Sequence, residues 1–174
     1  MFGAGDAKVG KIVKGTAAHG RILKTQFLQG LPALGKLMES LTAEWRSTAK
    51  KRFNAKFNRM EYYDGTITGL DGRPILVPSE HQVLVYLLQS DEAVMMSAAY
   101  NKIHKELSKR YEWGIDYGVV CFYHDEVNVE CREEIAEEVG KITAEAIAWA
   151  GRFYNISCPH LGQAKIGKNW YEVH

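Results

Sequence analysis

The stretch that most restricts the fold is CFYHDEVNVEC, in which three polar side chains separate two apolar segments. Residues 119–123 are apolar or aromatic, and residues 127–131 alternate apolar with polar side chains. A period of two is typical of a strand with one buried face. The stretch therefore predicts a β-hairpin whose connection is His124, Asp125 and Glu126. The connection is either an ordinary solvated turn or a set of carboxylates held at a rigid corner to bind metal.

Helical patterns flank this hairpin. Ser79 and Gln82 stand at capping-box spacing, and apolar residues then recur at threes and fours for about seven turns, up to a stop at Gly114. After the hairpin, residues 132–151 predict an amphipathic helix with acids in its first turn and Gly151 at its end. The side chains expected to face inward are Ile135, Val139, Ile142, Ala146 and Trp149.

The first third of the chain is also expected to be mainly helical. A glycine turn, Gly3-Ala4-Gly5, precedes Asp6, which suits the N-cap of a helix. The turn lacks the lysine and serine of a phosphate-binding loop, so a tight link between elements explains it better. A helical pattern then continues to about Ala55, and Pro32 is expected to begin a second helix after Gly30.

Two further segments complete the expected fold. TITGLDGRPILV predicts a hairpin that turns at Asp71-Gly72, and GQAKIGKNWYEVH predicts short strands around Gly162 and Gly167. Helices alternating with hairpins indicate an α/β (α+β) fold, in which helices pack on a small antiparallel sheet.

KKRFNAKFNR, residues 50–59, interleaves five basic side chains with Phe53 and Phe57. Two interpretations remain open for this segment. It is either a patch that contacts nucleic-acid phosphates or the solvated face of a helix anchored by two aromatic rings.

Composition restricts the function only loosely. The 174 residues suffice for one domain, and 22 basic against 21 acidic side chains mean that any basic surface is local. Cys121, Cys131 and Cys158 include no C-x-x-C pair, which argues against a disulfide framework or a zinc ribbon. No apolar run approaches the ~18 residues of a membrane span, and no signal sequence is evident. These features predict a soluble cytoplasmic protein.

Five motifs in order resemble the C-terminal part of family A DNA polymerases, the DNA polymerase I superfamily, and most closely its phage replicative branch. FGAGDAKVGKIV resembles the end of the nucleotide-binding fingers helix, and GLDGRPILVPS resembles the hairpin that leads into the palm. HQVLVYLLQS is similar to the palm helix that lies along primer and template. HDEVNVEC is similar to the third polymerase motif, and IGKNWYEVH resembles the closing segment with its terminal histidine.

The resemblance implies a DNA-directed DNA polymerase, a nucleotidyltransferase with a two-metal Mg²⁺ site. Asp125 corresponds to the catalytic aspartate that binds the metals, and Glu126 corresponds to the neighbouring acid. His124 is expected beside the primer terminus. Hard oxygen ligands suit Mg²⁺, and two such ions can activate a hydroxyl and stabilise a leaving pyrophosphate.

DNA contacts are implied in the same way. Gln89 corresponds to a glutamine that hydrogen-bonds in the minor groove, where acceptors are common to all base pairs. His81 corresponds to a basic or polar contact, whereas Val85 replaces an asparagine that is frequent in the family. Phe2, in place of the usual tyrosine, is expected to stack near the templating base, in the turn that includes Gly3 and Gly5.

The implied architecture is a partial polymerase right hand. Residues 1–74 correspond to the C-terminal part of the fingers and residues 75–174 to the C-terminal part of the palm. A second metal-binding aspartate and the triphosphate-binding lysine and arginine have no counterpart in this sequence. We therefore expect the chain to be inert alone. Its partners would be an upstream polymerase fragment that supplies that aspartate, primer-template DNA and deoxynucleoside triphosphates, with no membrane involved.

Two other functional classes remain open. One is a catalytically silent DNA-binding or regulatory module that keeps Gln89 and the basic segment. The other is an unrelated metal-dependent phosphoesterase built on Asp125 and Glu126.

Overall fold

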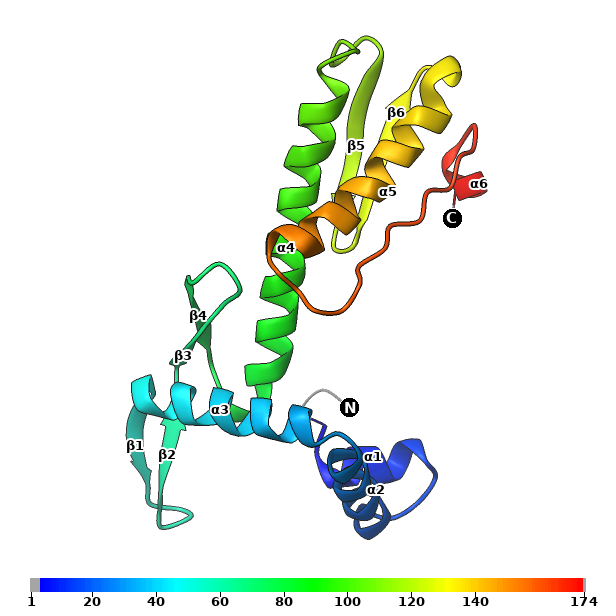
Figure 1. Cartoon of the computed structure of the whole chain (residues 1–174). Coiled ribbons are helices and arrows are strands. Elements are labelled where there is room, and N and C mark those ends of the chain that lie inside the picture. Colours follow the sequence, from blue (N-terminus) through cyan, green and yellow to red (C-terminus); the bar gives the residue numbers. More distant parts are fainter. Residues whose placement is uncertain (1–3, 174) are drawn as a thin grey trace. The chain divides into compact units, whose positions relative to one another are not determined.

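The computed structural model describes residues 4–173, and the chain divides into two compact units, Met1–Ser90 and Asp91–His174 (Figure 1). The first unit contains α1 (Asp6–Ile12), α2 (Ala17–Gly30), α3 (Pro32–Thr48), β1 (Lys50–Asn54), β2 (Arg59–Tyr63), β3 (Gly65–Thr68), β4 (Pro74–Val77) and the 3₁₀ helix η1 (Glu80–Gln82). Helix α4 (Val83–Leu107) begins in this unit and ends in the second. The second unit continues with β5 (Tyr117–Tyr123), β6 (Glu126–Cys131), η2 (Glu133–Ile135), α5 (Ala136–Phe153) and α6 (Trp170–Val173).

The predicted mixed α/β fold with antiparallel pairing is confirmed, but the single small sheet that was expected is replaced by separate two-stranded sheets. Within residues 4–173 the strands form three separate two-stranded sheets, β1–β2, β3–β4 and β5–β6. Each sheet is a hairpin of consecutive strands, which is the simplest antiparallel pairing. No helix among the described residues is long and apolar enough to cross a membrane.

The core of the first unit is centred on Trp45 of α3, which is fully buried. Its indole Nε1 donates a hydrogen bond of 2.8 Å to the carbonyl oxygen of Val77 at the end of β4. Gly65 allows this close packing, because a Cβ atom there would lie 2.5 Å from the Trp45 carbonyl oxygen. The other buried members of this core are Leu41, Ala49, Ile67, Val77, Val83 and Leu84.

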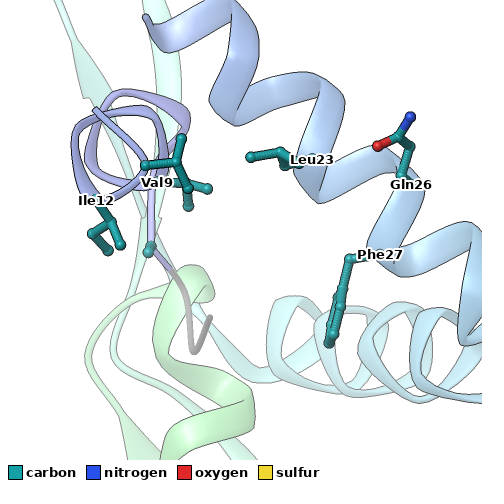
Figure 2. Close-up of a pocket in the computed structure, with 7 residues that line it drawn as sticks. Val9, Ile12, Leu23, Gln26 and Phe27 are labelled. Carbon is teal, nitrogen blue, oxygen red and sulfur yellow. The ribbon is translucent and has the colours of Figure 1, made fainter. Parts of the chain in front are cut away.

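Helices α1 and α2 pack closely against each other, and this packing depends on glycine. A Cβ atom at Gly20 of α2 would overlap the backbone carbonyl oxygen of Asp6 in α1. An apolar groove between the two helices remains open to solvent, and Figure 2 shows side chains of both helices lining it. Its lining residues are Ala4, Val9, Ile12, Val13, Leu23, Gln26 and Phe27.

Helix boundaries in the first unit are predicted only in part. Pro32 is the first residue of α3, as expected from its fixed φ angle. The N-cap of α1 is Gly5, so the prediction of Asp6 as N-cap is wrong by one residue. The Asp6 carboxylate instead forms an ion pair of 2.9 Å with Lys24 of α2, which compensates part of the charge of Asp6.

The expectation of helix up to Ala55 is wrong. Helix α3 ends at Thr48, and residues 50–63 form the β1–β2 hairpin with Lys50 opposite Tyr63 and Asn54 opposite Arg59. The predicted β3–β4 hairpin is confirmed. Because β3 ends at Thr68 and β4 begins at Pro74, the connection is longer than the expected Asp71-Gly72 turn.

The second unit packs the end of α4 and the whole of α5 on the β5–β6 hairpin, along which α5 lies in Figure 1. Val139 and Ala146 of α5 are buried, as predicted for its inward face. Predicted Ile135, Ile142 and Trp149 pack against the same core. The core also includes Ala99, Ile103, Leu107, Tyr117 and Ala150.

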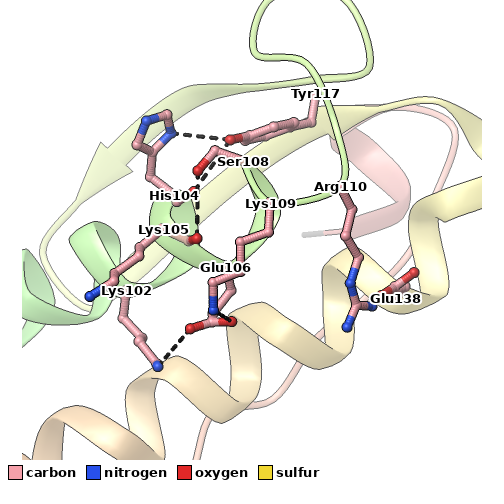
Figure 3. Close-up of polar contacts among 9 residues, drawn as sticks. All are labelled: Lys102, His104, Lys105, Glu106, Ser108, Lys109, Arg110, Tyr117 and Glu138. Atoms are coloured by element: carbon pink, nitrogen blue, oxygen red, sulfur yellow. Dashed lines mark hydrogen bonds and ion pairs between the residues drawn. The ribbon is translucent and has the colours of Figure 1, made fainter.

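Polar contacts fix the end of α4 (Figure 3). The Tyr117 hydroxyl lies 3.1 Å from Nδ1 of His104, which links β5 to α4. Elsewhere near the end of α4, the Glu106 carboxylate accepts hydrogen bonds from Lys102 at 2.8 Å and from Lys109 at 2.6 Å. Arg110 forms an ion pair with Glu138 of α5.

Two expected helix ends and one expected pair of strands in the second unit are wrong. Helix α4 ends at Leu107, well before Gly114, which occupies a left-handed turn with φ 82°. Helix α5 continues past Gly151 to Phe153, and Gly151 packs closely against the ring of His160. Residues 162–173 form irregular chain and the short helix α6 instead of strands.

Candidate functional site

The β5–β6 hairpin has one acidic side chain in its two-residue turn and a second at the first residue after it. Tyr123 pairs with Glu126 as the last rung of the ladder, so the turn consists of His124 and Asp125. His124 has φ 50°, a left-handed conformation of the kind that short hairpin turns require. The prediction of a polar hairpin tip is confirmed, but Glu126 is the first residue of β6 and not part of the connection.

Asp125 is exposed, and its carboxylate forms no hydrogen bond or ion pair with any residue from 4 to 173. Glu126 is partly buried, and its Oε1 accepts a 2.7 Å hydrogen bond from Nδ2 of Asn128. The two neighbouring acids therefore differ. Asp125 offers both carboxylate oxygens to a ligand, whereas Glu126 is already held by the strand.

His124 is positioned by two neighbours. Its Nδ1 lies 3.7 Å from Oε1 of Glu92 in α4, and its ring meets Tyr123 edge-on at 4.3 Å between centroids. Glu92 is thus a third acid near the turn, and sequence reasoning missed it. No local pattern could have identified it, because 31 residues separate it from His124 in the chain.

Asp125 and Glu126 supply the type of ligand that Mg²⁺ prefers, but too few ligands to complete a site. Mg²⁺ prefers hard oxygen ligands in octahedral geometry, and it commonly keeps several waters. Among residues 4–173, no group of three or more His, Cys, Asp or Glu side chains is arranged to hold a metal ion. Asp125 and Glu126 can therefore hold a cation only together with ligands from elsewhere.

The predicted DNA-binding residues belong to the first unit, whereas the turn belongs to the second. His81 in η1 and Gln89 in α4 are both exposed, and Val85 is partly buried. Gly5 is exposed at the N-cap of α1. The predicted contacts of Phe2 and Gly3 lie outside the described residues.

Comparison with known proteins gives a consistent set of relatives. No protein-family model matches the chain. The chain is 34% identical over 178 residues to the DNA-directed DNA polymerase of Enterobacteria phage T3, and equally to that of Escherichia phage T7. It is 26% identical over 166 residues to DNA polymerase I of Aquifex aeolicus (strain VF5).

These alignments include nearly all of this chain but only a part of each relative. Both phage alignments cover 100% of the chain and 25% of the relative, and the A. aeolicus alignment covers 94% and 26%. The chain thus spans about a quarter of the length of the curated relatives it matches. The fold is similar to the POL domain of Pol1 from M. smegmatis, solved in complex with DNA primer-template and dNTP. That match has a TM-score of 0.71 and 15% identity, and it covers 94% of this chain and 28% of that chain.

Proposed function

Since this chain is homologous to about a quarter of the family A DNA polymerases of phages T3 and T7, we propose that it is the C-terminal part of a DNA-directed DNA polymerase. In this proposal it supplies one metal-binding aspartate, Asp125, and a set of primer-template contacts. Template-directed nucleotidyl transfer then requires the polymerase segments that correspond to the other three quarters of the relatives.

The observation that carries this proposal is the Asp125 carboxylate at the tip of the β5–β6 hairpin. It is exposed and unpaired within residues 4–173, and ladder pairs that extend to Tyr123 and Glu126 hold its backbone. A short hairpin that is paired up to its turn gives a ligand a fixed position, which matters because transfer depends on the placement of the reacting groups. When bound, two Mg²⁺ ions would activate the primer 3′-hydroxyl and stabilise the leaving pyrophosphate.

The neighbours of Asp125 have separate roles in this proposal. Glu126 is restrained by Asn128, so it contributes negative charge beside the cation more readily than it reorients to bind it. His124 lies next to Asp125 in the turn, and we assign it to the primer terminus on the resemblance alone. Its approach to Glu92 orients the imidazole and leaves Nε2 available to a ligand.

Contacts to primer-template would come from the exposed polar residues of the first unit. The Gln89 side-chain amide can donate to minor-groove acceptors that all base pairs share, so it would sense base-pair geometry without reading sequence. On the resemblance alone, we also assign primer-template contacts to His81, Gly5, Phe2 and Gly3. The proposed subdomains are the end of the fingers, residues 1–74, and the end of the palm, residues 75–174.

Reconstitution tests this function. The chain is mixed with the polymerase fragment that it lacks, taken from the same source, and primer extension is measured with Mg²⁺ and all four deoxynucleoside triphosphates. We expect extension from the mixture and none from the chain alone. Asp125→Asn should lower the rate about 100-fold or more, because an amide replaces the charged ligand.

The control is Asp71→Asn, which alters an aspartate in another hairpin connection, one that is bound to Arg73, and it should leave extension unchanged. Primer-template affinity is measured in parallel, since Asp125→Asn should affect transfer more than binding. Full activity of Asp125→Asn, or extension by the chain alone, would contradict the proposal. Tight, salt-sensitive binding of primer-template by the mixture without extension would instead favour a silent DNA-binding module.

A further inference from the structure

The β1–β2 hairpin concentrates positive charge in a chain that is nearly neutral. Residues 50–63 contain five basic side chains and one acidic side chain, whereas the whole chain contains 22 basic and 21 acidic ones. Most of the hairpin is exposed to solvent. A local excess of this kind attracts a polyanion even when the net charge of the chain does not.

The two faces of the hairpin differ in how this charge is balanced. Cross-strand partners share a face, so Arg52 lies with Glu61 and Asn54 lies with Arg59. On that face Glu61 accepts from Asn54 at 2.8 Å and forms ion pairs of 3.3 Å with Arg52 and 3.8 Å with Arg59. The only acid of the hairpin therefore compensates this face.

The opposite face is apolar and carries an uncompensated cation. It presents Lys51 with its partner Tyr62, and Phe53 with its partner Met60. Phe53 is 60% exposed, Met60 50% and Tyr62 39%. The Lys51 Nζ lies 5.5 Å from the centre of the Tyr62 ring and forms no ion pair with any residue between 4 and 173.

The turn of the hairpin continues this arrangement. Phe57 is 58% exposed and has two cations near its ring, with Lys56 Nζ 5.5 Å and the Arg59 guanidinium 5.4 Å from the ring centre. Lys56 also lacks an ion pair within the described part of the chain. Exposed aromatic rings and unpaired lysines thus alternate along one face and around the turn.

This combination selects one class of ligand. Single-stranded nucleic acids bind proteins by stacking bases on aromatic rings while cations hold the phosphates. Paired bases in a duplex are not available for stacking on exposed rings, and an acidic peptide would need the lysines but not the rings. We propose that the β1–β2 hairpin binds single-stranded nucleic acid, with bases stacked on Phe53, Phe57 and Tyr62 and phosphates at Lys51 and Lys56.

This interaction does not rest on the proposed metal-binding role of Asp125, and it is expected without divalent cations. Binding of the purified chain to a fluorescein-labelled single-stranded oligonucleotide is measured by fluorescence anisotropy. The other probes are its duplex, an RNA of the same sequence, and a strand in which abasic sites replace the bases. We expect DNA and RNA single strands to bind similarly and the duplex and the abasic strand to bind more weakly.

Two variants separate stacking from charge. The double variant Phe53→Ala and Phe57→Ala should weaken binding of the single strand about 10-fold or more, and it should leave the abasic strand unaffected. The double variant Lys51→Gln and Lys56→Gln should reduce the slope of log affinity against log salt concentration by about 1.4. Both variants alter exposed side chains, so circular dichroism should show an unchanged fold.

The matched controls are Tyr171→Ala, an aromatic side chain with 90% exposure in α6, and Lys36→Gln, an exposed lysine in α3. Both should bind the single strand as the unaltered chain does. Equal binding of duplex and single strand, or no effect of the phenylalanine variant, would overturn the proposal. A competition experiment with polyglutamate tests the remaining alternative. If polyglutamate displaced the strand and bound the phenylalanine variant as tightly as the unaltered chain, the surface would be an acidic-peptide site and the proposal would be overturned.

Discussion

Glu106 of α4 illustrates how a single carboxylate becomes a determinant of stability through its two neighbours. Hydrogen bonds from Lys102 and then Lys109 lower the pKa of Glu106 from 4.5 to about 2 (Figure 3). The group is accessible to water, so salt screens both interactions. Its protonation nevertheless differs between the folded and the unfolded chain across an experimentally accessible pH range.

This difference predicts an acid-dependent loss of stability. Because the pKa of Glu106 is lower in the folded state, its contribution is complete above about pH 4.5 and is lost as the pH falls towards about 2. In urea unfolding at several pH values, Glu106→Gln should show a smaller loss of stability over this window than the unaltered chain. Equal pH dependence of the two proteins would contradict the prediction, and added salt should reduce the difference between them.

Individual site residues were predictable from the sequence where the chemistry is local. The polar tip with Asp125 follows from two alternating apolar segments and their short connection, and the structure has that tip. Glu92 was not predictable, because it approaches His124 only through the packing of α4 against β5. The assignment of Asp125 to metal binding depends on the resemblance and stays a prediction.

At the scale of elements, the α1–α2 pair offers a clear test of close packing. Gly20→Ala places a methyl group against the backbone of Asp6 and Gly10, which cannot move like a flexible side chain. We expect a loss of about 1–3 kcal/mol in the free energy of unfolding. The control is Gly35→Ala in α3, where no atom lies within 4 Å of the new Cβ and where alanine should add about 0.5–1 kcal/mol.

Urea unfolding followed by circular dichroism measures both variants. A decrease in the midpoint for Gly20→Ala together with an increase for Gly35→Ala would support the packing described here. If Gly20→Ala were as stable as the unaltered chain, the two helices could not be packed as closely as the structure has them.

Elements with a clear period were predicted well, and those formed by distant pairing were not. The helical spacing of α5 and the hairpins β3–β4 and β5–β6 can be read within a short window of sequence. The β1–β2 hairpin was mistaken for helix because Phe53 and Phe57 are four residues apart, a spacing that suits one helical face. Its strand character depends on pairing with residues 59–63, which lie beyond that window.

At the scale of the whole molecule, the chain consists of two compact units whose boundary falls between Ser90 and Asp91, inside α4. Each unit has its own buried core, the first around Trp45 and the second around Tyr117 and Val139. A continuous helical pattern gives no sign of such a boundary, which is why the sequence could not locate it. The predicted fingers and palm ranges rest on the resemblance and stay a prediction.

Because each strand among residues 4–173 has a single neighbour, half of its backbone groups point away from any other strand. Inward and outward amides alternate along an antiparallel pair, so deuterium uptake should alternate between slow and fast from one residue to the next in β6 and on either side of the register shift at Val120 in β5. Where a complementary polymerase segment contributes a further strand, the fast set should become slow and the alternation should disappear. Uniformly slow uptake in the chain alone would instead reveal pairing between copies of it, and amide-resolved exchange would then locate the edge along which those copies associate.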